Sequence, residues 1–315
     1  MAAPKNYGRS LAYLQFQARL TSEIRNFWYL NNSTHYAKRW IESIPSEDIP
    51  ATLGKFKGDE DHPFTSLDIP PNVFMDTQSD VLSSLRENTV VTFVTALEVY
   101  LFNAVERTIF LHPACMKDSG LTFTASELAG FMDKDEPKVA FASAVADKYM
   151  RNKSHAEMIK KLAKMIQSGV ATSLKSDVEE WNKWSLVRNS IVHVGRGVSQ
   201  DLYEVWKTRF TSVESPLNIK DREVVRVHHL ALKIAKELDS RFIETTVKSS
   251  DAELFARELF VLYGISNPSQ LSSQVSRILK CKFSKSNAER ALALQRQGEK
   301  IIGFRFTPEM FKGVT

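Results

Sequence analysis

The strongest constraint on the fold is residues 81–110, an apolar segment without a glycine or proline. Its apolar and weakly polar residues recur three or four positions apart, as on the core-facing side of a helix: Val90, Val94, Leu97, Leu101, Val105 and Thr108. Pro113 then ends the pattern. Glycine and proline total only 23 of 315 residues, whereas average usage is about 12%. We therefore expect an all-α fold with at most one minor strand.

The same periodicity predicts the other helices: about 6–44, 126–132, 138–150, 155–168, 176–195, 222–247, 250–264, 269–279 and 287–299. Five prolines and an acidic triplet interrupt residues 45–73. Residues 301–306 alternate weakly, like one short strand. The predicted organisation is an N-terminal helical and irregular extension over 1–75, a central helical domain over 76–248, and a basic helical segment over 249–315.

Several features favour a cytoplasmic protein. No run of about 18 uncharged apolar residues is present, because Glu98 interrupts residues 90–105. We therefore expect no membrane-spanning helix. The first residues lack the apolar region of a secretion signal. Only two cysteines, Cys115 and Cys281, are present, too few for a disulfide scaffold.

Positive charge is concentrated at the C-terminal end. Residues 276–315 contain nine basic and three acidic side chains, while the whole chain carries +5. Such a segment attracts polyanions, so Lys280, Lys282 and Lys285 are predicted to bind a nucleic-acid substrate. Phenylalanines among them could stack on bases: Phe283, Phe304, Phe306 and Phe311. The alternative is a solvated basic helix whose phenylalanines pack inward. If the segment binds RNA, deleting residues 276–315 should weaken that binding.

Common cofactor and metal motifs are missing. The sequence has no phosphate-binding Gly-x-x-x-x-Gly-Lys-Ser/Thr, and Gly195-Arg196-Gly197 lacks the third glycine of a dinucleotide-binding fingerprint. His112 and Cys115 have ligand-like spacing, but no second pair completes a zinc site. We expect no cofactor and no metal.

Residues 185–197 contain the most informative group of side chains. On a helix, Asn189 and His193 are four positions apart and lie about 40° apart. Arg188 lies about 140° from His193 and flanks the same polar sector from the Asn189 side. Val187, Ile191 and Val194 form the apolar stripe expected to hold this helix.

These residue types suit RNA cleavage by the neighbouring 2′-hydroxyl. Histidine exchanges a proton near neutral pH, and a guanidinium stabilises charge on phosphate oxygens. Asn189 could orient the imidazole or hold a phosphate oxygen. A solitary histidine on a helix is, however, usually structural.

Two further residues, Glu98 and Arg196, are candidates for this site. Glu98 lies about 40° from Val94 within an apolar stripe, so its carboxylate needs a partner. Arg188 or His193 could supply it; alternatively, Glu98 pairs with Arg107 or another arginine for structural reasons. Arg196 follows the helix and either contacts RNA or faces solvent.

The motif Arg188-Asn-Ser-Ile-Val-His193 resembles the Arg-x(4–6)-His motif of HEPN domains, including the asparagine after the arginine. The tryptophans before it and the helix containing residues 93–101 are also similar to that family. The resemblance covers roughly residues 80–248. It implies a bundle of four to five helices that dimerises, so that two motif helices form one metal-independent endoribonuclease site. It also implies a role as a toxin or antiphage effector that acts on tRNA or other cellular RNA, with Arg188, His193 and Asn189 in the site.

Two other functions remain open from the sequence. One is a catalytically silent HEPN-like module that binds nucleic acid or regulates a partner. The other is a helical interaction protein outside this family. Whether the protein is an enzyme or a silent module, a trigger or regulatory partner could act on its terminal segments.

Overall fold

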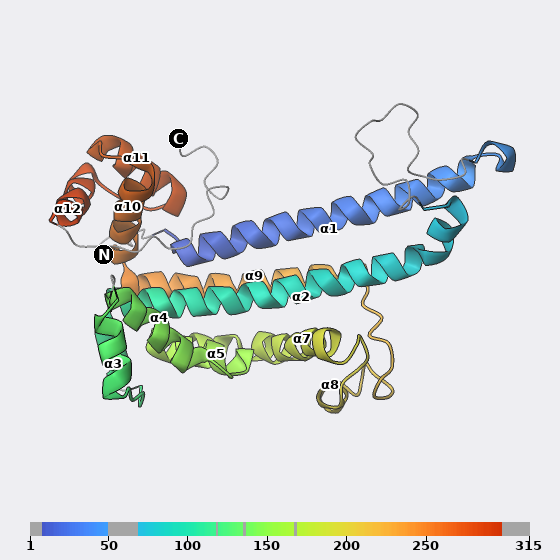
Figure 1. Cartoon of the computed structure of the whole chain (residues 1–315), viewed down its shortest axis with the longest axis horizontal. Coiled ribbons are helices and arrows are strands. Elements are labelled where there is room, and N and C mark those ends of the chain that lie inside the picture. Colours follow the sequence, from blue (N-terminus) through green and yellow to red (C-terminus); the bar gives the residue numbers. More distant parts are fainter. Residues whose placement is uncertain (1–7, 50–68, 118, 135–136, 167–168, 298–315) are drawn as a thin grey trace. The chain divides into compact units, whose positions relative to one another are not determined.

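The described part of the chain is mainly helical. The computed structural model describes residues 8–49, 69–117, 119–134, 137–166 and 169–297, with no strand among them. Figure 1 labels most of its helices, which are α1 (Leu11–Ser43), α2 (Pro71–Leu111), α3 (Ala125–Met132), α4 (Pro137–Met150), α5 (His155–Met165), α6 (Val170–Ser173), α7 (Lys175–His193), α8 (Gln200–Val205), α9 (Asp221–Arg241), α10 (Ser250–Tyr263), α11 (Pro268–Leu279) and α12 (Lys285–Arg296). The predicted all-α class is confirmed, while the predicted strand at 301–306 lies outside the described residues.

The chain divides into two compact units that do not follow its order. Unit 1 comprises residues 1–20, 94–185 and 229–315, and unit 2 comprises residues 21–93 and 186–228. The predicted divisions at residues 75 and 248 are linear, whereas α1, α2, α7 and α9 each contribute residues to both units. A long helix can belong to two units because its two ends bury their apolar faces against different neighbours.

Local sequence signals set many helix ends. Thr124 begins α3 and Ser154 begins α5, each in a capping box completed by a glutamate three residues later. Gly264 ends α10 in the left-handed conformation, with φ of +66°. α2 starts at Pro71, ten residues earlier than predicted, because a proline is compatible with the first helical position. The predicted helix over 222–247 instead changes at Phe242 into a π-helical turn, Phe242–Val247.

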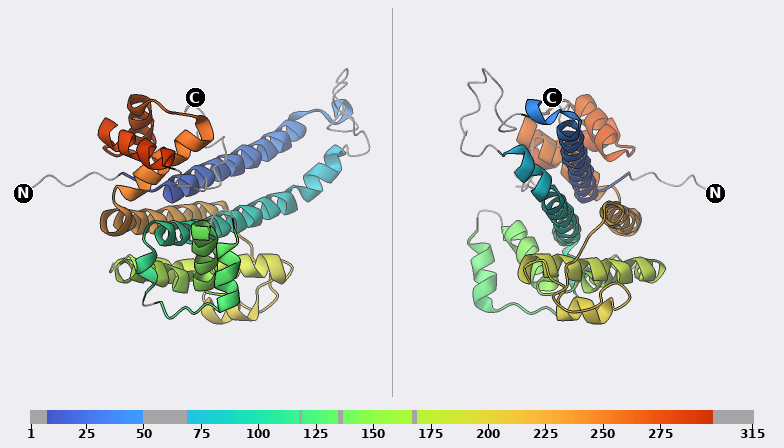
Figure 2. Two further views of the ribbon diagram at one scale, coloured as in Figure 1. Left: turned by 60° about the vertical axis from the view of Figure 1, so that its left-hand side comes forward. Right: turned by 90° about the vertical axis from the view of Figure 1, so that its right-hand side faces the viewer.

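The C-terminal helices of unit 1 form a core of their own. Figure 2 shows α10, α11 and α12 side by side in two views. Leu11 of α1 joins the buried residues between them: Ala252, Phe255, Ala256, Leu259, Ile265, Leu271, Val275, Leu279, Cys281, Phe283, Ala288, Ala291 and Leu292. The predicted base-stacking role of Phe283 is wrong, because its side chain is only 4% exposed. Phe304, Phe306 and Phe311 lie outside the described residues.

One described helix, α2, has the length and apolar composition of a membrane span. The sequence predicted no such helix because Glu98 interrupts the uncharged run within α2. Of the most apolar 18-residue stretch of α2, 56% is buried inside the protein. A core helix that is buried on one side has the same composition, so this property is weak support for a membrane span.

Candidate functional site

Helix α7 carries the predicted motif at its C-terminal end. Trp181 and Trp184 are buried, as predicted for core residues, and so is Val187. The predicted apolar stripe is wrong at Val194, which is 42% exposed. The helix ends one residue before it, at His193, so Val194 lies at the exposed end of the helix. Ser190 is the buried residue of the last turn instead.

The three motif residues lie within the last six residues of α7. Arg188 is half-buried and donates from Nη1 to Asn189 Oδ1 over 3.1 Å. Its Nε is buried and has no hydrogen-bond partner among the described residues. Asn189 and His193 are exposed. The asparagine therefore orients the guanidinium, and an imidazole one turn further along the helix is open to solvent.

A serine pair holds the segment that follows the motif. The Ser190 hydroxyl donates to Ser199 Oγ over 2.9 Å, and the Ser199 N–H donates back to Ser190 Oγ over 3.2 Å. Ser199 also begins α8 by accepting from the Leu202 N–H. Because Ser190 lies inside α7, this pair fixes the loop against the end of the helix that carries Arg188, Asn189 and His193.

Two glycines shape the loop between the serines. Gly195 has a φ of +64°, which a glycine adopts without strain. A Cβ at Gly197 would lie 3.3 Å from Glu214 Cα and from Glu214 O, and Gly197 forms an isolated antiparallel bridge with Pro216. The close approach expected at these glycines is therefore made by the chain's own backbone.

Arg196 connects this loop to α2 within unit 2. Its Nη1 donates to Ser84 Oγ over 2.7 Å, and its Nε lies 3.2 Å from Glu87 Oε2. The Glu87 side chain is 6% exposed, while that of Arg196 is 51% exposed. Burial raises the pKa of Glu87, and the positive charge of Arg196 opposes that rise. Arg196 thus has a structural partner and still presents half of its side chain to solvent.

Glu98 lies in unit 1, whereas Arg188, Asn189 and His193 lie in unit 2. Its expected burial is wrong, because the side chain is 47% exposed. The buried side of α2 is centred near Leu97 and Ala104, about 100–120° from Glu98 around the helix. Glu98 therefore lies at the margin of the apolar face.

The structure gives Glu98 a histidine partner in its own unit. Glu98 Oε2 lies 3.7 Å from His155 Nε2, and Trp181 Nε1 donates to His155 Nδ1 over 3.0 Å. An indole N–H can only donate, so the neutral His155 ring carries its proton on Nε2, facing Glu98. The predicted pairing of Glu98 with Arg188 or His193 stays a prediction.

The three predicted substrate lysines are exposed around the start of α12. Lys280 ends α11 in the left-handed conformation, and Lys282 follows two residues later. Lys285 lies 3.9 Å from Glu289 on the next turn. Deleting residues 276–315 would remove core residues as well as charge, so single-residue substitutions are the appropriate test of these lysines.

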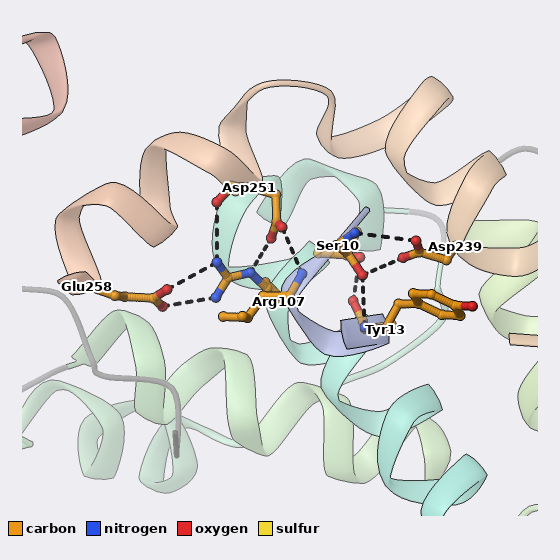
Figure 3. Close-up of polar contacts among 9 residues, drawn as sticks. Ser10, Tyr13, Arg107, Asp239, Asp251 and Glu258 are labelled. Carbon is orange, nitrogen blue, oxygen red and sulfur yellow. Dashed lines mark hydrogen bonds and ion pairs between the residues drawn. The ribbon is translucent and has the colours of Figure 1, made fainter. Parts of the chain in front are cut away.

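Sequence reasoning missed a buried charged cluster in unit 1, drawn in Figure 3. Arg107 is fully buried and makes an ion pair with Asp251. It also binds Glu258 through two nitrogens, at 2.9 and 3.2 Å. Burial would lower the pKa of Arg107, but the two carboxylates raise it above its ordinary value. Arg107 and Glu258 are charged residues within apolar helix faces, the only sequence signal for this cluster.

The start of α1 is hydrogen-bonded to carboxylates of the same region (Figure 3). Leu11 N–H donates to Asp251 Oδ2 over 3.1 Å, and Ser10 N–H donates to Asp239 Oδ2 over 3.3 Å. The Ser10 hydroxyl also binds Asp239. Carboxylates near a helix N-terminus satisfy its free N–H groups and oppose its positive dipole. Burial raises the pKa of Asp239 to about 7, although the hydrogen bonds from Ser10 oppose the rise.

Within the described ranges, no three histidine, cysteine, aspartate or glutamate side chains are grouped so as to hold a metal ion. Comparisons with known proteins add no assignment: no family model matches the chain, and no curated protein or solved structure matches it.

Proposed function

We propose that the protein is a metal-independent endoribonuclease whose catalytic residues are Arg188 and His193, with Asn189 as a positioning residue. The observation that carries the proposal is the arrangement at the end of α7, where a half-buried guanidinium is hydrogen-bonded to Asn189 and an exposed imidazole follows Asn189 four residues later on the helix. The resemblance of residues 188–193 to the HEPN motif adds the expectation that two copies of the chain form one site in the cytoplasm. A trigger or regulatory partner would then control a toxin or antiphage activity.

The proposed reaction is cleavage by the neighbouring 2′-hydroxyl. The 2′-oxygen forms a bond to phosphorus while the bond from phosphorus to the 5′-oxygen breaks, leaving a 2′,3′-cyclic phosphate and a 5′-hydroxyl. One His193 accepts the proton of the 2′-hydroxyl, and His193 of the second copy donates a proton to the leaving oxygen. Arg188 stabilises the charge that develops on the phosphate oxygens.

The direct test is incubation of total cellular RNA and tRNA with the purified full-length protein in EDTA. We expect discrete products that end in 2′,3′-cyclic phosphate, and we expect His193→Ala to abolish them. His35→Ala is a matched control, because His35 is also an exposed helical histidine. Equal cleavage by the two variants would contradict the role of His193, whereas an inactive, folded wild-type protein that binds RNA would favour the silent module.

The arginine has its own test. Lysine keeps the charge of Arg188 but loses the fork that contacts two phosphate oxygens at once, so Arg188→Lys should lower kcat about 100-fold or more. Arg19→Lys is the control, because Arg19 is exposed on α1. Asn189→Ala should lower kcat less, since it removes the acceptor that orients Arg188 but no reacting group.

A further inference from the structure

The second half of α1 exposes more aromatic surface than any other helix in the described part of the chain. Tyr29 and Tyr36 are 73% and 74% exposed, and Trp40 is 44% exposed. Figure 1 shows α1 as one uninterrupted helix. Large aromatic side chains are normally buried in a monomer, so three of them on one helix indicate a binding surface.

Tyr29, Tyr36 and Trp40 lie on one line along the helix, whereas Trp28, which is 39% exposed, lies about 100° from it. At about 100° per residue, Tyr36 and Trp40 fall within about 20° of Tyr29. The buried residues of this half, Phe27, Asn31 and Ile41, lie away from the rings, about 120–160° from Tyr29. We call the exposed side the aromatic face of α1; its ten residues, all exposed, are Ser22, Arg25, Asn26, Tyr29, Asn32, Ser33, Tyr36, Arg39, Trp40 and Ser43.

The composition of this face indicates its ligand. Beside the three rings it contains two arginines, two asparagines and three serines, but no carboxylate and no aliphatic side chain. Neither Arg25 nor Arg39 makes an ion pair with a described residue. Aromatic rings and guanidinium planes stack on unpaired bases, arginines neutralise phosphates, and amides and hydroxyls bind base edges and phosphates. The face is therefore complementary in charge and chemistry to single-stranded nucleic acid.

A partner helix fits this face less well. Positions spaced alternately by four and three residues would form the seam of a helix pair: Ser22, Asn26, Tyr29, Ser33, Tyr36, Trp40 and Ser43. Four of these seven residues are serine or asparagine, and none is Leu, Ile, Val or Met. Such a seam would bury polar groups without supplying an apolar core.

We propose that the aromatic face of α1 binds single-stranded RNA by stacking its bases on Tyr29, Tyr36 and Trp40, with Arg25 and Arg39 on the phosphates. Only the identification of the ligand as RNA rather than DNA rests on the proposed function. Tyr29 and Trp40 are about 16 Å apart along the helix axis. At about 3.4 Å per stacked nucleotide, this length accommodates about four bases between the outer rings.

The test measures the binding of a fluorescein-labelled 16-nucleotide single-stranded RNA to the full-length chain. Fluorescence anisotropy, recorded in EDTA, gives the Kd. All variants carry His193→Ala, so that cleavage does not consume the probe. Replacing Tyr29, Tyr36 and Trp40 together by alanine should weaken binding about 10- to 100-fold. Alanine favours helix, and these side chains are exposed, so the variant should keep the wild-type circular dichroism spectrum. Leu30→Ala is the matched control, because Leu30 is 49% exposed on a different side of the same helix.

Salt dependence separates the two kinds of contact. Replacing Arg25 and Arg39 by glutamine should reduce the slope of log Kd against log salt by about 1.4, or about 0.7 for each phosphate contact with a single strand. The aromatic variant should lose affinity with little change in that slope. A duplex of the same sequence should bind more weakly than the single strand, because its bases are already stacked.

The outcomes distinguish this inference from the proposed function. Cleavage that depends on His193, together with unchanged RNA binding by the aromatic variant, would overturn the inference and leave the function. Binding that depends on the aromatic face, without cleavage, would support the inference and contradict the enzyme. Absence of RNA binding would overturn the inference. A wild-type dimer that the aromatic variant converts to a monomer, with unaltered RNA affinity, would overturn it in favour of a protein partner.

Discussion

Arg107 Nη1 and Glu258 Oε1 lie 2.9 Å apart, and neither side chain has solvent-exposed area. Arg107 also binds Asp251, so one buried cation serves two buried carboxylates. The second negative charge is compensated by the first turn of α1, where the Leu11 N–H donates to Asp251. This cluster connects α2, α10 and the start of α1 within unit 1.

Arg107→Ala should destabilise the protein by about 3–5 kcal/mol, because it leaves two carboxylates buried without their cation. Urea unfolding followed by circular dichroism measures the change. Arg151→Ala is the control, since Arg151 is 67% exposed and pairs with Asp147 one turn away; its loss should be below about 1 kcal/mol. Similar losses in the two variants would contradict the assigned importance of the cluster.

Asp239 predicts a pH dependence of stability. Burial raises its pKa from 3.8 to about 7 in the folded state, so the folded state holds this proton more tightly than the unfolded state. Its contribution to the free energy of unfolding is therefore full below pH 4 and is lost as pH rises through about 7. Nearby, Arg9 opposes the rise in pKa and Asp251 adds to it.

Asp239→Asn provides the comparison, because it removes the titrating group at similar volume. The stability of the wild type relative to this variant should fall between pH 4.5 and 7 and stay level above pH 8. Free energies of unfolding from urea titrations at five pH values would show it. Parallel curves for the two proteins would mean that Asp239 ionises in the folded state as it does in the unfolded chain.

Ser190→Ala should destabilise the protein by about 1–3 kcal/mol, because the Ser199 N–H loses its acceptor. It should also speed hydrogen exchange of the amides in 195–199 and lower RNA cleavage. Ser185→Ala on the same helix is the control, since the Ser185 hydroxyl binds only the carbonyl of Trp181 one turn before it. If cleavage survives while the loop exchanges faster, the serine pair is purely structural.

Lys280, Lys282 and Lys285 are predicted to contribute to RNA affinity through charge. Replacing all three by glutamine should reduce the slope of log Kd against log salt by about 2, if each contacts one phosphate of a single strand. The matched control replaces three other exposed lysines of unit 1, Lys153, Lys160 and Lys164. Equal slopes for the two triple variants would assign the effect to overall charge.

Most helices were predictable because their signals are local. The periodicity of 81–110, the capping boxes at Thr124 and Ser154, and the stop at Gly264 depend on residues within one or two turns. The core positions of Trp181 and Trp184 followed from the same spacing. Asn189 and His193 are four positions apart on one helix and Arg188 adjoins Asn189, so their placement on the same helix end also followed from the helix alone.

Relations between distant segments were not predictable in this way. The apolar stripe of α2 contained Glu98, yet its exposure depends on which side of α2 faces its neighbours. The pairing of Arg107 with Asp251 joins residues 144 positions apart. The serine pair of Ser190 and Ser199 depends on how the loop after α7 folds back against that helix. The sequence thus specifies helices and their polar faces through short-range periodicity and capping. Burial, charge pairing and the altered pKa of Asp239 arise from packing between helices, because desolvation and Coulomb interactions depend on distance in space rather than along the chain.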